Sequence, residues 1–216
     1  MDALAVLNGR TGLAGADLVV LGDSVAEGRD DPDPAGGWRG WAGRLAEALY
    51  LPEERVVNAG TPGATLARVV ADELPAVRHL RPRMVVLNCG MNDAINGFDR
   101  VEAAGQLAEI LGWARSAGAV GIVAPVPEPP LLERSIISNF RKNRILERIQ
   151  IINAELNQGA RAFDMEFLDF EAVPLVVDQS LWAIDGIHLN PAGHAYVAEV
   201  ITHVSRTLLG EHATAS

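Results

Sequence analysis

The feature that most constrains this chain is an alternation between short, continuously apolar runs and longer segments with helical spacing. Runs that are apolar at every position suit strands buried on both faces, because a strand with one solvated face alternates apolar and polar residues. Five runs have this character, the last of them weakly: residues 17–22, 55–58, 83–88, 119–125 and 161–165. The pattern predicts a five-stranded parallel sheet covered by helices on both faces.

The segments between these runs carry apolar residues three or four positions apart, a spacing that places them on one face of a helix. The clearest stripe consists of Ile145, Ile149, Ile152 and Leu156. Near the C-terminus, Asn190 followed by Pro191 is typical of a helix N-cap and first helical position. Strands that alternate with helices predict a three-layer α/β/α, doubly wound domain with the flavodoxin-like strand order 2-1-3-4-5.

The length of 216 residues suits a single domain over residues 1–216. We expect residues 1–16 to form an N-terminal extension, because the first strand pattern begins only after them. Four prolines fall in the six residues 125–130, and residues 131–138 have no clear period. Residues 125–138 are therefore predicted to form a lid or long loop.

Composition excludes several classes of protein and partner. The chain has 18 basic and 28 acidic residues, a net charge of −10, which argues against nucleic acid as a partner. No run approaches the ~18 apolar residues of a membrane span, and the N-terminus lacks the basic segment of a secretory signal. We therefore expect a cytoplasmic protein. The single cysteine, Cys89, excludes an internal disulfide, and we interpret it as a buried apolar residue.

Polar groups suited to acyl transfer follow the first three predicted strands and precede the last helix. Their segments are Gly22–Ser24, Asn58–Gly60, Gly90–Asp93 and Asp185–His188. Ligands of open parallel sheets bind at the carboxyl ends of the strands, where these segments meet. Each segment alone has an ordinary explanation as a turn or helix cap, so it is their coincidence that indicates a site.

The predicted strand order gives these groups distinct roles. It places Ser24 between Gly60 and Asn92, so that the backbone N–H groups of Ser24 and Gly60 and the Asn92 amide form an oxyanion hole. Ser24 is the candidate nucleophile and needs a base. His188 is the best candidate among five histidines, and Asp185, three residues earlier, is placed to orient its ring.

These four segments resemble the blocks of the SGNH hydrolase superfamily, the GDSL-type lipases and esterases. They occur in the family's order and span nearly the whole chain, although Val25 stands where the family name has leucine. The resemblance implies a three-layer fold with five parallel strands and ester or thioester chemistry without a metal or other cofactor. It also implies that Ser24, Gly60, Asn92 and His188 have the roles given above.

Three alternatives remain open at this point. The chain could be an acyltransferase or thioesterase acting on a carrier-linked acyl group, or a flavodoxin-like binding module without activity. A metallohydrolase with Asp185, His188 and His194 as ligands is the third, but no metal-binding motif is present and His194 is better explained by helix packing.

Two features bear on the choice of substrate. Trp182, close to Asp185 in sequence, is predicted to line the acyl pocket of a small or medium-sized ester or thioester. Arg141 and Arg144 belong to a basic cluster in this acidic chain. This cluster is either a solvated helix face or a docking surface for an acyl carrier protein or the phosphates of CoA.

Overall fold

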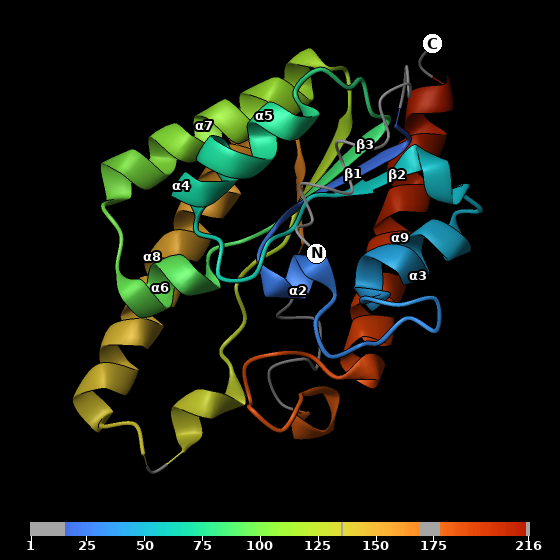
Figure 1. Ribbon diagram of the computed structural model, residues 1–216. Coiled ribbons are helices and arrows are strands. Elements are labelled where there is room, and N and C mark those ends of the chain that lie inside the picture. Colours follow the sequence, from blue (N-terminus) through green and yellow to red (C-terminus); the bar gives the residue numbers. More distant parts are fainter. Residues whose placement is uncertain (1–15, 135, 169–177, 215–216) are drawn as a thin grey trace.

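The computed structural model describes residues 16–134, 136–168 and 178–214 and shows five parallel strands in one sheet (Figure 1). The strand order is β2-β1-β3-β4-β5, as predicted. The register pairs Val19 with Val57 on one side and with Val85 on the other. The strands are β1 (Leu18–Gly22), β2 (Val56–Asn58), β3 (Met84–Asn88), β4 (Val120–Val123) and β5 (Glu166–Phe167).

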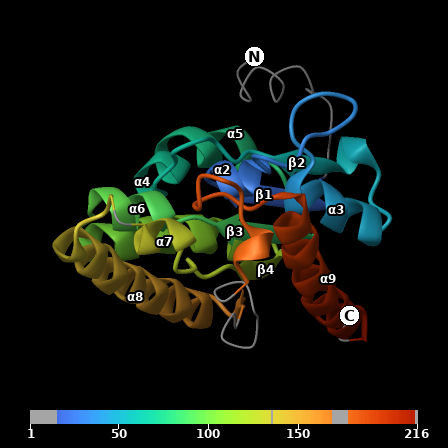
Figure 2. The same cartoon turned by 90° about the horizontal axis from the view of Figure 1, so that it is seen from below.

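Helices cover both faces of this sheet, which confirms the three-layer α/β fold (Figures 1 and 2). Helices α3 (Gly40–Ala48) and α9 (Pro191–Thr214) pack together on one face. The opposite face carries α4 (Leu66–Arg68), α5 (Leu74–Val77), α6 (Met91–Asn96), α7 (Arg100–Ser116) and α8 (Asn139–Ala162). The short helix α2 (Ser24–Glu27) directly follows β1, and 3₁₀ turns lie at Glu53–Arg55, Pro130–Glu133 and Gln179–Leu181.

The continuous apolar runs have the expected physical cause, because alternate residues of each strand are buried in two separate cores. In β1, Val19 and Leu21 contribute to the core beneath α5, α7 and α8, whereas Leu18 and Val20 contribute to the core beneath α3 and α9. Every residue of β1 is buried. A strand enclosed on both faces therefore carries no polar side chain until it reaches the edge where ligands bind.

One sequence prediction about the elements is wrong in detail, and one helical segment is irregular. The fifth strand begins at Glu166, not at Arg161, because α8 continues through the helix-forming residues up to Ala162 and ends where Asp164 adopts φ 57°. The helical segment that begins at Leu66 is interrupted by a π-helical turn at Val69–Glu73. Pro75, within α5, cannot donate the regular helical hydrogen bond, which favours this local irregularity.

The segment predicted as a lid contacts the histidine-bearing turn. Leu131 N–H donates to the carbonyl of Gly186 at 2.8 Å, and the Arg134 guanidinium donates to the carbonyl of Ile184. Whether this segment opens and closes remains a prediction, and the expected extension at residues 1–16 lies almost entirely outside the described residues. Within the described ranges, no helix is long and apolar enough to cross a membrane.

Candidate active site

The turn that carries Ser24 is built by close packing at the end of β1. Gly22 adopts φ 144°, and a Cβ atom there would lie 1.9 Å from the carbonyl oxygen of Asn88. Only glycine therefore fits this turn. Asp23 then caps α2 by accepting a hydrogen bond from Val25 N–H at 2.9 Å, so Ser24 occupies the first position of the helix. Ser24 is held between the strand and a helix N-terminus.

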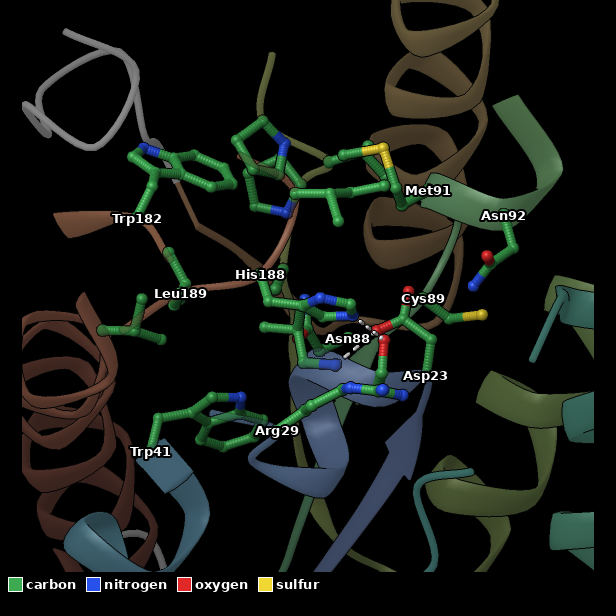
Figure 3. Close-up of a pocket in the computed structure, with 18 of the residues that line it drawn as sticks. Asp23, Arg29, Trp41, Asn88, Cys89, Met91, Asn92, Trp182, His188 and Leu189 are labelled. Atoms are coloured by element: carbon green, nitrogen blue, oxygen red, sulfur yellow. Dashed lines mark hydrogen bonds between the residues drawn. The ribbon is translucent and has the colours of Figure 1, made fainter. Parts of the chain in front are cut away.

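His188 lies over this turn and contacts Ser24 directly (Figure 3). The Ser24 Oγ and His188 Nε2 atoms are 2.9 Å apart, and the His188 Nδ1 atom lies 2.5 Å from Asp185 Oδ2. The other oxygen of Asp185 accepts the backbone N–H groups of Ile187 and His188. The structure thus brings Ser24, His188 and Asp185 together in a nucleophile–base–acid arrangement.

The charge of Asp185 is favoured by its surroundings. Partial burial raises its pKa, but the hydrogen bonds from His188 N–H, Ile187 N–H and the imidazole outweigh burial and lower the pKa below its ordinary value. A second carboxylate, Asp30, lies 3.9 Å from His188 Nδ1. These three residues place potential metal-ligand atoms within 4.8 Å of one another, although Asp185 already occupies Nδ1 with a hydrogen bond.

The expected oxyanion donors do not all converge. Asn92 lines the pocket beside Ser24, and one of its amide hydrogens is donated to the carbonyl of Ala64 at 3.0 Å. The Gly60 N–H instead donates to Asn58 Oδ1 at 3.0 Å, and Gly60 is not among the residues that line the pocket. Its backbone nevertheless approaches α2 so closely that a Cβ atom would lie 2.8 Å from Glu27 N.

Sequence reasoning missed a group of buried carboxyls behind the Ser24 turn. Glu73, only 2% exposed, accepts the Gly22 N–H at 2.9 Å and the Thr61 hydroxyl at 2.6 Å. Burial raises the pKa of Glu73 to about 7, although the hydrogen bonds from Thr61 and Gly22 oppose this. Glu73 therefore joins the turn that carries Ser24 to Thr61, which follows the Asn58–Gly60 segment. No motif marks it, because it lies in an irregular helical turn.

Two further carboxyls belong to this buried group. Burial raises the pKa of Asp23 to about 6, against the opposing hydrogen bond from Val25 N–H. Burial likewise raises the pKa of Asp93 to about 6, although Leu66 N–H donates to both of its oxygens. Both lie in the motifs identified from sequence, but the buried setting that shifts their pKa values appears only in the folded chain.

A cavity of about 260 Å³ opens beside Ser24 and His188 (Figure 3). Trp182 lines it, together with Trp41, Leu189 and other mainly apolar side chains. Among the described residues of its lining, Arg29 is the one lysine or arginine. The cavity is slightly smaller than typical drug-sized sites, which suits a small or medium-sized acyl group.

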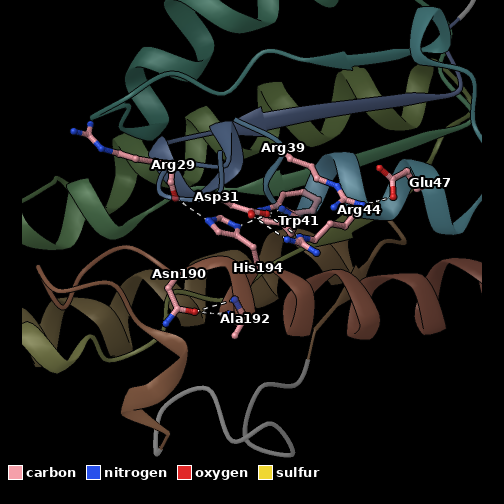
Figure 4. A network of polar contacts seen from close by, with 10 residues as sticks. Arg29, Asp31, Arg39, Trp41, Arg44, Glu47, Asn190, Ala192 and His194 are labelled. Carbon is pink, nitrogen blue, oxygen red and sulfur yellow. Dashed lines mark hydrogen bonds and ion pairs between the residues drawn. The ribbon is translucent and has the colours of Figure 1, made fainter. Parts of the chain in front are cut away.

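The remaining histidine and cysteine candidates have structural roles. The His194 Nδ1 atom accepts the Trp41 backbone N–H at 3.2 Å, and the Nε2 atom lies 2.8 Å from the carbonyl of Arg29 (Figure 4). His194 thus joins α9 to α3 and to the segment after α2, and burial lowers its pKa. Cys89 is buried and burial raises its pKa well above the ordinary value, which disfavours a nucleophilic thiolate.

The basic residues Arg141 and Arg144 do not line the cavity. Arg141 and Arg144 are exposed on the first turns of α8, and neither lines the pocket. Their neighbours are engaged locally, since Lys142 pairs with Glu133 and Arg148 donates to backbone carbonyls of α6. The structure gives Arg141 and Arg144 no direct contact with a substrate held at Ser24.

The fold and the Ser24–His188–Asp185 arrangement define a serine hydrolase built on a flavodoxin-like sheet. Comparison of the sequence with known families shows that residues 20–196 match the GDSL-like lipase/acylhydrolase family, and the chain belongs to this family. The esterase TesA of Pseudomonas aeruginosa is 34% identical over 199 residues, which is 89% of each chain. The thioesterase 1/protease 1/lysophospholipase L1 of Escherichia coli K12 is 29% identical over 183 residues, 84% of this chain and 79% of that protein.

Solved structures show the same fold. A GDSL-like lipase from Bacteroides thetaiotaomicron superposes with a TM-score of 0.69 at 19% identity, covering 95% of this chain and 98% of that one. The crystal structure of TesA gives the same TM-score at 24% identity, covering 88% and 98%. Family membership confirms the expectation of an enzyme that hydrolyses esters or thioesters and disfavours the binding-module alternative.

Proposed function

We propose that this protein hydrolyses a small or medium-sized carboxylic ester or thioester through an acyl-Ser24 intermediate. The contact that supports this most directly is the 2.9 Å approach of Ser24 Oγ to His188 Nε2. His188 takes the serine proton as Oγ attacks the carbonyl carbon, and then protonates the leaving alcohol or thiol. Asp185 accepts from Nδ1–H, keeps the ring in this tautomer and stabilises the imidazolium that forms.

The negative charge of the tetrahedral intermediate needs donors at the other side of Ser24. We propose that these are the backbone N–H of Ser24, the remaining amide hydrogen of Asn92 and the N–H of Gly60. The Gly60 N–H must then exchange its bond to Asn58 Oδ1 for one to the substrate oxyanion. This exchange is local, because Asn58 stays anchored through its own donation to the carbonyl of Ala26 at 2.8 Å.

The experiment that tests this proposal combines a covalent probe with a substitution. A serine-directed phosphonate is expected to label the wild-type chain at Ser24, and Ser24→Ala is expected to lower turnover of a p-nitrophenyl ester by at least about 10³-fold. Circular dichroism controls for folding. Labelling at another residue, or substantial turnover by a folded Ser24→Ala variant, would contradict the assignment.

An acyl carrier protein or CoA is the proposed source of a thioester substrate, and the exposed Arg141 and Arg144 are the proposed contact. Charge reversal at both positions is expected to weaken turnover of a carrier-linked acyl group while leaving a neutral ester unaffected, because neither residue lines the cavity. Equal loss on both substrates contradicts this proposal. The cytoplasmic location that such a partner requires stays a prediction, which cell fractionation tests.

A further inference from the structure

The lining of the cavity includes an arginine that the proposed mechanism does not use. Arg29 is exposed and lines the cavity, so it lies where the cavity opens to solvent. Among the described residues, its guanidinium forms neither a salt bridge nor a hydrogen bond. Two other ionisable residues of the lining are already engaged, since Asp23 is only 4% exposed and both ring nitrogens of His188 contact active-site partners.

The backbone of Arg29 is held beside the nucleophile. Its N–H donates to the carbonyl of Ser24 at 3.0 Å, and its carbonyl oxygen lies 2.8 Å from Nε2 of His194. Figure 3 shows the Arg29 side chain extended from the side of Trp41 toward the side of Asp23. The guanidinium thus ends a side chain whose starting point is fixed relative to Ser24.

The carboxylates that are close to Arg29 in sequence do not pair with its guanidinium. Asp31 instead accepts two N–H groups of Arg44, at 2.8 and 2.9 Å. Asp30 lies 3.9 Å from Nδ1 of the active-site imidazole. Burial raises the pKa of Glu27 and the charge of Arg29 opposes this rise, yet the two side chains form no salt bridge. Arg29 is therefore available to an anion that enters the cavity.

The cavity has a buried apolar part and an exposed charged part. Trp41, Val197 and Ile201 line it and are at most 6% exposed, whereas Arg29 is exposed. The proposed acyl group suits the apolar part, which leaves the solvent side to the leaving group. An anion loses less hydration there than in the enclosed part. A guanidinium offers paired N–H donors that match the oxygens of a carboxylate or a phosphate.

We propose that Arg29 binds an anionic group, a carboxylate or a phosphate, on the leaving group of the substrate. The scissile ester or thioester bond then lies between the apolar part of the cavity and the guanidinium. A chain with a net charge of −10 repels anions at long range, so an anionic substrate needs a local cation of this kind. The proposal rests on the proposed function, because it names the substrate class of the same site.

The kinetic test keeps the acetyl group constant and varies the leaving group. The anionic esters are p-acetoxybenzoate and p-acetoxyphenyl phosphate, and p-acetoxybenzamide is their neutral counterpart. Arg29→Gln is expected to lower kcat/KM for at least one anionic ester by about 5- to 20-fold, mainly through KM, and to change the neutral ester less than about twofold. The ester with the larger loss shows whether a carboxylate or a phosphate is the preferred anion.

Two further variants control for charge and for folding. Arg29→Lys keeps the charge but not the planar fork, and is expected to retain part of the preference for the anionic esters. Arg83→Gln removes an exposed arginine just before β3, at the opposite edge of the sheet, and should leave all three substrates unaffected. Thermal melting of Arg29→Gln should match the wild type, because the substitution breaks no side-chain contact within the described ranges.

A binding measurement separates this inference from the proposed catalysis. The folded Ser24→Ala variant is titrated calorimetrically with the leaving groups p-hydroxybenzoate, p-hydroxyphenyl phosphate and p-hydroxybenzamide, which needs no turnover. Adding Arg29→Gln is expected to weaken binding of the preferred anion by about 5- to 20-fold and to spare the amide. If the protein lacks esterase activity but this anion binding persists, the proposed function fails and the anion site stands.

Two kinetic results would overturn the inference while the proposed function stands. One is an equal loss on the anionic and the neutral esters after Arg29→Gln, which would show that Arg29 acts on the site as a whole. The other is an unchanged kcat/KM for both anionic esters, which would show that the guanidinium stays in solvent during turnover.

Discussion

Two groups of carboxyl side chains flank the Ser24 turn, and they differ in exposure. Asp185 and Asp30 lie on the outer side around His188, where their side chains are 42% and 38% exposed. Asp23, Glu73 and Asp93 lie behind the turn and are almost fully buried. Hydrogen bonds lower the pKa of Asp185, whereas burial raises the pKa values of the inner three.

This contrast indicates that the two groups of carboxyl side chains have different roles. In the proposed mechanism Asp185 must be charged, since it stabilises the imidazolium of His188 in each catalytic cycle. The inner carboxyls accept hydrogen bonds from backbone N–H groups of the nucleophile turn and of α4, so they hold the backbone in place. Under the proposed mechanism, the acid that supports proton transfer is thus separate from the acids that hold the backbone of the site.

The largest expected effect comes from the outer group. Asp185→Asn retains an oxygen that can accept the Ile187 and His188 N–H groups, but its amide cannot accept from the imidazole. We expect kcat to fall by about 10²- to 10⁴-fold, because the wrong tautomer of His188 is favoured. Thermal melting checks that the fold is intact. A fall of less than tenfold would show that Asp185 is not the orienting acid.

Substitution of an inner carboxyl is expected to affect stability and activity together. Glu73→Ala leaves the Gly22 N–H and the Thr61 hydroxyl without their acceptor, which we expect to cost about 2–4 kcal/mol in urea unfolding. The loosened turn should lower kcat about tenfold with little change in KM. Glu73→Gln keeps one acceptor and is expected to recover part of both losses. If Glu73→Ala is destabilised but keeps the wild-type kcat, Glu73 has no effect on catalysis.

The inner carboxyls also predict an unusual dependence of stability on pH. Their folded-state pKa values of about 6 to 7 exceed the ordinary values of the unfolded chain, so the folded state binds more protons between about pH 4 and pH 7. These carboxyls therefore stabilise the fold most in acid, and this contribution is lost as pH rises through that range.

Urea unfolding at pH 5 and pH 8 measures this effect. Glu73→Gln is expected to reduce the difference between the two pH values by on the order of 1–3 kcal/mol. Glu109→Gln, which replaces an exposed acid, is the control and should leave the difference unchanged. A Glu73→Gln variant with the wild-type difference would show that Glu73 titrates as it does in the unfolded chain.

The smallest expected effect distinguishes the two outer carboxylates. Asp30 lies 3.9 Å from His188 Nδ1 without a hydrogen bond, and a partly exposed charge pair of this kind is worth at most about 1 kcal/mol. Asp30→Asn is therefore expected to change kcat/KM less than about fivefold.

Activity is also expected to survive a strong chelator. Loss of activity with chelator, restored by a divalent metal, would indicate that Asp30, Asp185 and His188 act as metal ligands.

Local sequence patterns predicted most of the framework. Continuous apolar runs indicate strands enclosed on both faces, and β1 and β3 match them within one residue. The prediction failed at β5, where Ala160–Ala162 continues a helix although the following residues have strand character. Short strands at the edge of a sheet have few neighbours, so their ends depend on the preceding helix rather than on their own composition.

The sequence by itself indicated buried parallel strands covered by helices, the family and the residues expected to react, because these depend on local patterns and short motifs, whereas the strand order was expected by analogy with flavodoxin-like sheets. Only the tertiary structure decided that Glu73 joins Gly22 to Thr61, and that the Gly60 N–H is directed to Asn58. The contacts of Glu73 join residues from different elements, and the pKa shifts of the inner carboxyls follow from burial. Neither can be read from spacing, since both arise when distant segments exclude water together.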